Sequence, residues 1–210
     1  MTPKKIITVS REFGSGGHTI AQKVAERLGY TFYDSEIVKR VAEQTGFDES
    51  FIDHAGEYSP GKSRFSFSFV ARDACGLSVD DKVWLAQLNV ILEVAEKGNC
   101  VIVGRCADFL LKDYADCLHV FIHAPYDSKA KRIVQLYGEN EESTRKRLMD
   151  KDSRRSVNYK YRTGGEWGKS QNYDLCLNSD RLGIDACVEM IVQIARGELP
   201  GEEGITGITE

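Results

Sequence analysis

The fold of this chain is decided by the stretch Ile6–Leu28, with the sequence IITVSREFGSGGHTIAQKVAERL. Ile6, Ile7 and Val9 form a short β-branched run, which is typical of a strand buried in a parallel sheet. From residue 20 to residue 28 the apolar side chains recur at helical spacing, and Gly29 stands where a helix C-cap belongs. The stretch therefore predicts a strand, a glycine-rich loop and a helix.

The loop between this strand and helix indicates an anion site. Gly14, Gly16 and Gly17 permit a tight turn whose backbone N–H groups point inward at the positive end of the following helix. A phosphate group is the natural occupant of such a turn. The alternative is a plain glycine-rich connection between a strand and a helix.

The loop departs from the standard P-loop pattern, which is a glycine, four residues, a second glycine, a lysine and a serine or threonine. When the pattern is aligned on Gly16, Arg11 stands at the first glycine, Gly17 at the lysine and His18 at the hydroxyl residue. Thr19 follows directly. The loop therefore keeps the glycines of an anion cradle and lacks the standard lysine.

Length and composition predict one domain. The chain has 210 residues, of which 41% are hydrophobic, so we expect a single domain over residues 1–196 and a loose tail over 197–210. No apolar run approaches the roughly 20 residues that span a bilayer, and the N-terminus leads straight into a strand, so we expect a cytoplasmic protein without membrane contact. Six cysteines without a Cys-x-x-Cys pair suit buried thiols and weigh against disulfides and structural zinc.

Strands and helices alternate along the rest of the chain. This order predicts an α/β fold, with a five-stranded parallel sheet and helices on both faces. Asp34 or Ser35 is expected to begin the second helix as its N-cap, and Arg105 comes directly after a buried strand. We expect Asp34, Arg40 and Arg105 at the carboxyl edge of the sheet, where open α/β folds bind ligands. Further strands are predicted at 31–34, 100–104, 117–123 and 173–178, and helices at 35–45, 80–97, 126–137 and 183–196.

Residues 47–79 are the least regular part, apart from a possible helix over 48–55. A loop of this length in a compact domain is usually functional or disordered. Phe65, Phe67 and Phe69 alternate with serines, which favours an edge strand over aromatic side chains that stack on a base.

Residues 140–170 form a basic segment. Between Arg145 and Ser170 the chain carries nine Lys and Arg against three acidic residues, whereas the net charge of the whole chain is −4. A basic segment in an acidic protein indicates an anionic ligand. The alternative is a solvated helix face, which usually mixes its charges in i,i+4 pairs.

Taken together, these motifs resemble the P-loop nucleoside monophosphate kinases, and most closely the cytidylate kinase-like family. The resemblance runs from Ile6 to Ile194 except over 47–79, where the acceptor-base region of the family is not matched. Val103 also stands where cytidylate kinases have an acid before the Gly-Arg pair. The matching motifs are the Gly14–Ala21 loop, Asp34-Ser35 with Arg40, Gly104-Arg105, and Asp152-x-x-Arg155 of the lid with Arg132 on the helix before it.

The resemblance implies a P-loop kinase fold that holds ATP or GTP with Mg²⁺ beside a small phosphorylated acceptor. It implies acceptor contacts for Asp34, Ser35, Arg40 and Arg105, and a catalytic role in phosphoryl transfer for Arg132, Asp152 and Arg155. Residues 47–79 would form an irregular insert on the acceptor side, and 140–170 a lid. The donor would contact Arg11, Gly14, Ser15, Gly16, Gly17, His18 and Thr19, with Thr19 on the metal.

Three functions stay open at this point. The leading one is a kinase. The residues that could then replace the missing lysine are Arg11, His18, Arg132 and Arg155, of which Arg155 ranks first. In such a kinase Gly17→Lys is expected to be tolerated. The second is a nucleotide-binding sensor without turnover. RNA binding by 145–170 is weaker, because the remaining surface is acidic and no recognised RNA-binding motif is present. The sequence does not indicate an oligomeric state.

Overall fold

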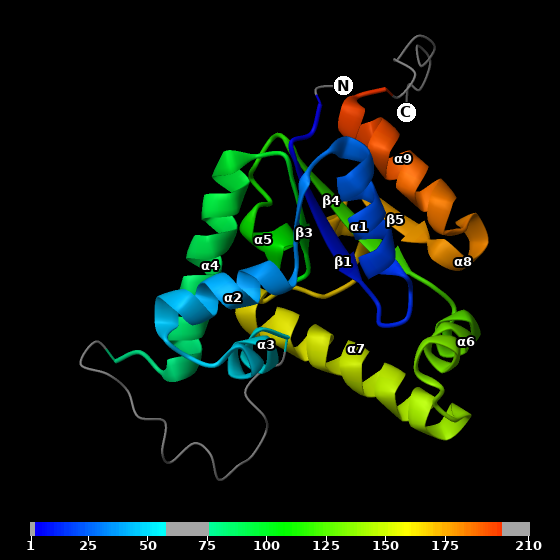
Figure 1. The fold of residues 1–210 in the computed structure, drawn as a ribbon, viewed down its shortest axis with the longest axis horizontal. Coiled ribbons are helices and arrows are strands. Elements are labelled where there is room, and N and C mark those ends of the chain that lie inside the picture. The colour runs from blue at the N-terminus through cyan, green and yellow to red at the C-terminus, as the bar shows by residue number, and fades with distance from the viewer. Residues whose placement is uncertain (1–2, 58–75, 199–210) are drawn as a thin grey trace, which may run out of the picture.

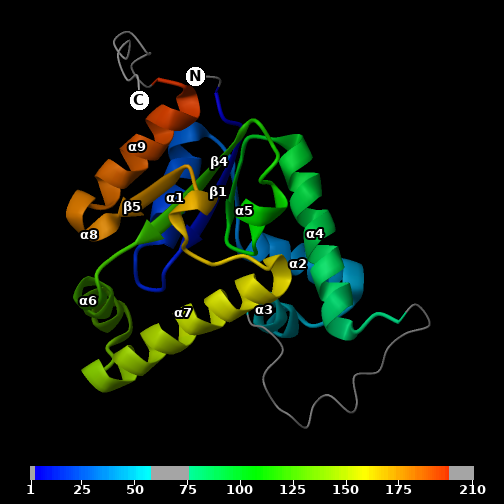
Figure 2. The ribbon, with the colours of Figure 1, turned by 180° about the vertical axis from the view of Figure 1, so that it is seen from behind.

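A computed structural model describes residues 3–57 and 76–198 of the chain, and within them five parallel strands form one sheet in the order β2-β3-β1-β4-β5. The predicted α/β fold, with helices on both faces of the sheet, is confirmed (Figures 1 and 2). The strands are β1 (Ile6–Arg11), β2 (Thr31–Tyr33), β3 (Cys100–Val103), β4 (Cys117–His123) and β5 (Leu175–Asn178). The helices are α1 (Gly17–Leu28), α2 (Ser35–Thr45), α3 (Glu49–Glu57), α4 (Val79–Lys97), α5 (Ala107–Leu110), α6 (Tyr126–Tyr137), α7 (Glu141–Thr163), α8 (Ser179–Leu182) and α9 (Ile184–Arg196), with a 3₁₀ turn η2 (Ser170–Asn172).

Strand β1 lies at the centre of the sheet. Ile6 pairs with Cys100 of β3 on one side and with Cys117 of β4 on the other. Because helices cover both faces of the sheet, the side chains of β1 are buried as far as Ser10, and Arg11 is the first that is partly exposed. The central strand therefore delivers the glycine loop (residues 11–17) to the middle of the carboxyl edge.

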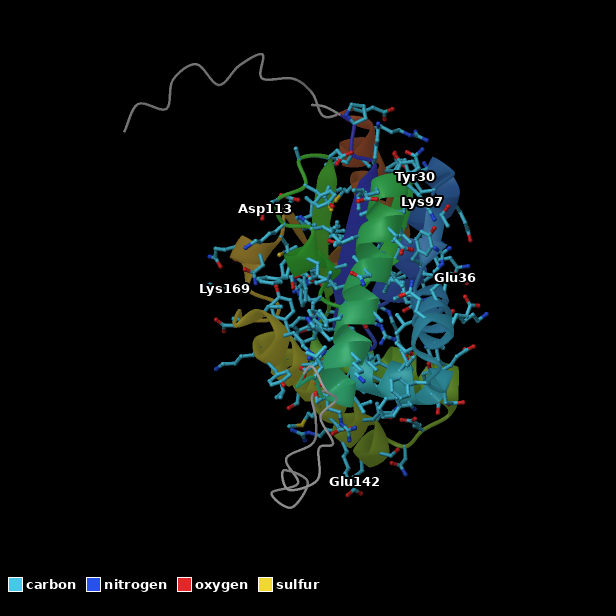
Figure 3. The ribbon with its side chains drawn as sticks, turned by 90° about the vertical axis from the view of Figure 1, so that its left-hand side faces the viewer. Tyr30, Glu36, Lys97, Asp113, Glu142 and Lys169 are labelled. Atoms are coloured by element: carbon cyan, nitrogen blue, oxygen red, sulfur yellow. The ribbon has the colours of Figure 1, made fainter. Side chains whose placement is uncertain are left out.

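The two faces of the sheet carry separate cores. Because side chains alternate along a strand, Ile7 faces α1 and α9 and packs with Ile20, whereas Ile6 faces α2 and α4 and packs near Ile37 and Ile91. Each of these isoleucines is buried, and full burial of such a side chain is worth about 1.5–3 kcal/mol. In a side view (Figure 3), Glu142 lies at the opposite end of the molecule from Tyr30 and Lys97.

Local capping rules explain most of the helix ends. Helix α1 ends at Gly29, whose φ of 68° is the left-handed conformation predicted for its C-cap. Helix α4 begins at Ser78, where the side chains of Ser78 and Asp81 form a capping box. Asp34 is the N-cap of α2, as predicted. Its side chain makes no capping hydrogen bond and instead pairs with His18.

The basic segment is mostly one long helix, α7, which begins at Asn140 as N-cap and crosses the carboxyl ends of the strands (Figure 1). It contacts α6 and α3. The helix predicted over 48–55 is present as α3. The predicted strand at Phe65–Phe69 and all but the first two residues of the predicted tail 197–210 lie outside the described residues. In the part of the chain that is described, no helix is long and apolar enough to cross a membrane.

Candidate functional site

The glycine loop has the tight conformation that the sequence predicts. Gly14 and Gly16 have φ values of 78° and 80°, a region that favours glycine, and Gly16 is the N-cap of α1. A Cβ atom at Gly14 would lie 3.1 Å from the carbonyl oxygen of Lys129. The Ser15 hydroxyl donates to the carbonyl oxygen of Glu12 at 2.8 Å, which ties the turn internally. The loop therefore presents the positive N-terminal end of α1 at the carboxyl edge of the sheet.

A pocket of about 580 Å³, here called the loop pocket, opens beside the glycine loop. It is lined by most residues of the loop, by His18 and Thr19 of α1, by Asp34, and by Arg132 of α6 and Arg155 of α7. The structure thus brings the predicted donor residues together with two of the three predicted catalytic residues, although Ser15 itself is buried within the turn.

A second, much smaller cavity of about 40 Å³, here called the arginine cavity, lies beside β3 and α7. Of the described residues, three arginines line it: Arg11, Arg105 and Arg155. Since one water needs roughly 10–15 Å³, the cavity admits a group of a few heavy atoms, such as one phosphate. Arg11 and Arg155 line both the arginine cavity and the loop pocket, so the two spaces meet at these side chains.

Arg105 sits on a strained piece of backbone. Gly104, Arg105 and Cys106 follow one another with φ values of 69°, 57° and 55°, a left-handed conformation that costs roughly 1–2 kcal/mol for each residue with a side chain. The side chain of Arg105 is 4% exposed, and its Nη2 lies 2.5 Å from the carboxylate of Asp53 on α3. Strain of this kind persists where the surroundings fix the backbone, and it is enriched at functional sites.

Asp34 and His18 form a pair at the rim of the loop pocket, 3.2 Å apart. Burial alone would raise the pKa of Asp34, but the hydrogen bond from His18 and the positive charges of Arg11 and Arg105 hold the pKa below its usual value. Ser35 and Arg40 are not among the described residues that line either cavity. Arg40 instead pairs with Glu36 at 3.2 Å and lies over the ring of Tyr33.

A network of charged side chains fastens α7 to the glycine loop. Asp152 accepts a hydrogen bond from the backbone N–H of Phe13 at 2.7 Å and an ion pair from Lys129 of α6 at 3.0 Å. Lys129 also lies 3.0 Å from Glu12. Burial would lower the pKa of Lys129, but Asp152 and Glu12 raise it, so this lysine is charged at neutral pH. Both carboxylate oxygens of Asp152 therefore hold protein donors.

The two predicted catalytic arginines also contact the glycine loop. Arg132 donates from Nη1 to the carbonyl oxygen of Gly14 at 3.2 Å and to the hydroxyl of Ser179 at 3.1 Å. Arg155 donates from Nη1 to the carbonyl oxygen of Arg11 at 3.2 Å. The ring of Phe13 lies under cations of α7, with Lys151 at 4.8 Å, Arg147 at 5.4 Å and Arg155 at 5.9 Å from its centroid.

Asp108 supports the arginine cavity from behind. It is buried, and it accepts hydrogen bonds from Tyr159 at 2.9 Å and from Ser10 at 3.4 Å, two residues that line the cavity. Burial raises the pKa of Asp108 above its usual value despite these hydrogen bonds. The carboxyl group thus orients two cavity side chains and does not itself line the cavity.

Two residues whose side chains carry oxygen ligands suited to Mg²⁺, Thr19 and Asp34, line the loop pocket. Mg²⁺ prefers such ligands and usually completes its shell with water and substrate phosphates. Among the residues with described positions, no group of three or more His, Cys, Asp or Glu could hold a metal by itself. The residues fit an ion that arrives together with a nucleotide.

Several residues of the site escaped the sequence analysis. In the sequence Lys129 looks like an ordinary surface lysine. Its position four residues before Ile133 could have indicated that it lies on the buried face of α6. Asp53 falls in the segment that matches no motif. Asn158, Tyr159 and Trp167, which line the arginine cavity, were seen only as part of a basic segment.

Comparison with known proteins finds that the chain is similar to cytidylate kinases. The model of the cytidylate kinase-like family matches residues 6–181. The chain is 25% identical over 187 residues to the cytidylate kinase of Ignicoccus hospitalis, with 89% of this chain and 96% of that protein covered. It is 26% identical over 189 residues to the cytidylate kinase of Methanopyrus kandleri, with 86% and 87% covered.

Solved structures agree on the fold. An uncharacterized protein from Eubacterium ventriosum has a TM-score of 0.69 at 28% identity, with 90% of this chain and 97% of that one covered. The shikimate kinase from Bacteroides thetaiotaomicron has a TM-score of 0.52 at 18% identity, with 90% and 96% covered. The second likeness shows the fold alone.

Proposed function

The chain belongs to the cytidylate kinase-like family, and from this premise we propose that it transfers a phosphoryl group from ATP or GTP to a small phosphorylated acceptor. The observation that carries the proposal is the meeting of the loop pocket and the arginine cavity at Arg11 and Arg155. Phosphoryl transfer depends on positioning two anions and on neutralising the charge spread over the transferring group. Two adjoining spaces that share Arg11 and Arg155 supply both conditions.

In this proposal the donor phosphates lie on the glycine loop and the acceptor phosphate lies on Arg105. Mg²⁺, held by Thr19 and the phosphates, would supply charge neutralisation on the donor. Arg155 would contact the transferring group from α7. Arg132 and Asp152 would act as positioning residues, because the first holds the carbonyl of Gly14 and the second holds the N–H of Phe13.

The test is a turnover assay with Mg²⁺, ATP or GTP, and a panel of nucleoside monophosphates that includes CMP, using Arg105→Ala as the variant. A charge-assisted contact is worth about 1.5–3 kcal/mol, so this variant should raise the KM for the acceptor by roughly tenfold or more while the KM for the donor barely changes. Arg105→Gly is the companion variant, because glycine adopts the left-handed backbone of this position without strain. An equal loss for donor and acceptor would make Arg105 a structural residue.

A nucleotide-binding sensor without turnover is the second candidate. Two contacts favour the sensor. The carboxylate of Asp53 already pairs with the guanidinium of Arg105, and the carboxylate of Asp152 already accepts a hydrogen bond from the N–H of Phe13. Thermal shift with ATP and Mg²⁺ distinguishes the two functions, since a ligand that binds the folded state raises Tm whether or not it reacts. A raised Tm without product for any acceptor supports the sensor and contradicts the kinase.

A further inference from the structure

Arg11 and Gly17 have exchanged the positions of a glycine and a cation in the standard P-loop pattern, and the structure joins the two changes in space. A Cβ atom at Gly17 would lie 2.5 Å from Cβ and 3.0 Å from Cγ of Arg11. Real Cβ atoms essentially never approach so closely, and Cβ of Arg11 is fixed by its strand. The aliphatic part of Arg11 therefore lies where a side chain at position 17 would begin.

A second glycine makes room for the other end of Arg11. A Cβ atom at Gly104 would collide with Nη1 of Arg11 and would lie 3.3 Å from its Cζ. The side chain thus runs from the end of β1, across Gly17 in the glycine loop, to Gly104 at the end of β3. This path ends beside Arg105, at the boundary of the loop pocket and the arginine cavity.

The charge of Arg11 acts at this boundary. The guanidinium is close enough to Asp34 to help lower the pKa of that carboxyl group, so it lies near the rim of the loop pocket as well as in the arginine cavity. Arg132 and Arg155 also line the loop pocket, and both donate hydrogen bonds to backbone carbonyl oxygens of the glycine loop. These contacts give Arg132 and Arg155 a part in holding the loop backbone, whereas the side chain of Arg11 crosses Gly17 itself.

We propose that Arg11 is the residue that takes over the charge of the missing lysine, with Gly17 and Gly104 kept side-chain-free by its path. In a standard P-loop the lysine reaches the β- and γ-phosphates from within the loop. Here the cation comes from the strand and ends between the donor and acceptor spaces, so it neutralises the terminal phosphoryl group of the donor. This assignment rests on the proposed kinase site and replaces Arg155 as the first candidate. It also reverses the prediction that Gly17→Lys is tolerated, because the new side chain would collide with Arg11.

The test is an exchange of the two residues. Arg11→Gly combined with Gly17→Lys restores the first glycine and the lysine of the standard pattern, with His18 still at the hydroxyl position. The double variant should recover turnover to within about tenfold of the parent, whereas each single change should cost at least about a hundredfold in kcat. Gly17→Lys alone should also lower Tm. The proposal is contradicted if Gly17→Lys alone retains the parent Tm and turnover, or if the turnover of the double variant is no higher than that of Arg11→Gly.

A second variant separates charge from packing. Arg11→Met keeps the aliphatic stem against Gly17 and removes the guanidinium, so it should weaken ATP by about tenfold while ADP affinity changes less than twofold. Arg27→Met is the matched control, because Arg27 lies on α1, pairs with Glu189 and lines neither cavity. An equal loss of ATP and ADP, or no loss of either, overturns the role of Arg11.

The outcome for Arg11 is independent of the outcome for catalysis. If no acceptor supports turnover, the kinase proposal fails, and the difference between ATP and ADP affinity in Arg11→Met still decides whether Arg11 contacts the terminal phosphate. If the parent protein binds neither nucleotide with Mg²⁺, the proposal for Arg11 is wrong as well.

Discussion

Asp53 and a bound acceptor phosphate would compete for the same donors on Arg105. The carboxylate of Asp53 is 59% exposed, whereas the guanidinium that it contacts is 4% exposed. The exposed carboxylate can return to water when it leaves, and a bound phosphate would then compensate the charge of the buried guanidinium in its place. An anion with two or more charges can therefore displace Asp53.

We expect Asp53→Asn to strengthen acceptor binding by about three- to tenfold, because the competing charge is removed and the shape of the side chain is kept. The measurement is the dissociation constant of CMP, or of whichever monophosphate supports turnover, by titration calorimetry. Asp48→Asn is the matched control, since Asp48 caps the start of the same helix and contacts Ser50. Weaker binding in Asp53→Asn would mean that the carboxylate orients Arg105 for its ligand.

At the scale of residues, the sequence predicted the glycines better than the cations. Gly14 and Gly16 could be placed because a positive φ has a strong residue preference. The path of Arg11 could not be predicted, because it ends at Gly104, 93 positions later in the sequence. The pairing of β1 with β3 brings these two residues together, and the alignment of a short motif contains no such long-range contact.

Polar contacts tie helix α7 to the glycine loop, both directly through Asp152 and through Lys129 of α6. The side chain of Lys129 is 10% exposed and joins Glu12 and Asp152. Removing one partner from a buried ion pair leaves an uncompensated charge and typically costs about 3–5 kcal/mol when burial is complete. Both carboxylates are partly exposed here, so the cost should be smaller.

We expect Lys129→Met to destabilise the protein by about 2–3 kcal/mol and to speed hydrogen exchange at the amide of Phe13, which loses a well-held acceptor. Lys131→Met is the control, because Lys131 is exposed on the same helix. Denaturant unfolding and exchange measured by NMR give the two quantities. Unchanged exchange at Phe13 would show that Asp152 holds the loop without help from Lys129.

Elements with clear periodicity could be predicted almost to the residue. Strand β4 and helix α6 begin and end at the predicted positions, because each has a regular pattern and a proline or glycine beside it. Helix α7 was predicted only as a basic lid segment, since few of its side chains are buried and its apolar periodicity is weak. The short helices α5 and α8 were missed because one turn of helix has no period to detect.

The stability of the whole molecule should depend on pH through His119. This residue is buried between strands, with Nδ1 2.8 Å from the hydroxyl of Thr8, and burial lowers its pKa despite the charges of Asp174 and Asp108. A group with a lowered folded-state pKa contributes stability that is complete above its unfolded value, near 6.5, and that is lost as the pH falls toward the folded value.

We therefore expect the free energy of unfolding to fall between pH 7 and pH 5 by at most about 1.4 kcal/mol per pH unit from this one group. His119→Gln should flatten that part of the curve, even if it lowers stability at every pH. Denaturant unfolding at a series of pH values gives both slopes. Parallel curves for parent and variant would assign the acid sensitivity to other groups.

The order of the strands was beyond prediction. Alternating strands and helices indicate a parallel sheet, but many orders satisfy that pattern. The observed order places β1 between β3 and β4, and this arrangement alone brings the end of β3, with Arg105, beside the glycine loop. The rule for open α/β folds therefore predicted Arg105 at the carboxyl edge, but only the strand order places it next to the glycine loop.

The central position of β1 has a consequence for how the protein is made. Ile6 pairs only with residues as distant as Cys100 and Cys117, and sheets built from such distant pairings fold slowly. During synthesis this strand leaves the ribosome before β3 and β4, and the backbone N–H and C=O groups of both its edges stay unpaired by the sheet until those strands have followed. Open edges are templates for wrong pairing with other chains. The strand that carries the glycine loop is thus exposed to chaperones, and to neighbouring nascent chains, for much of the time that translation takes.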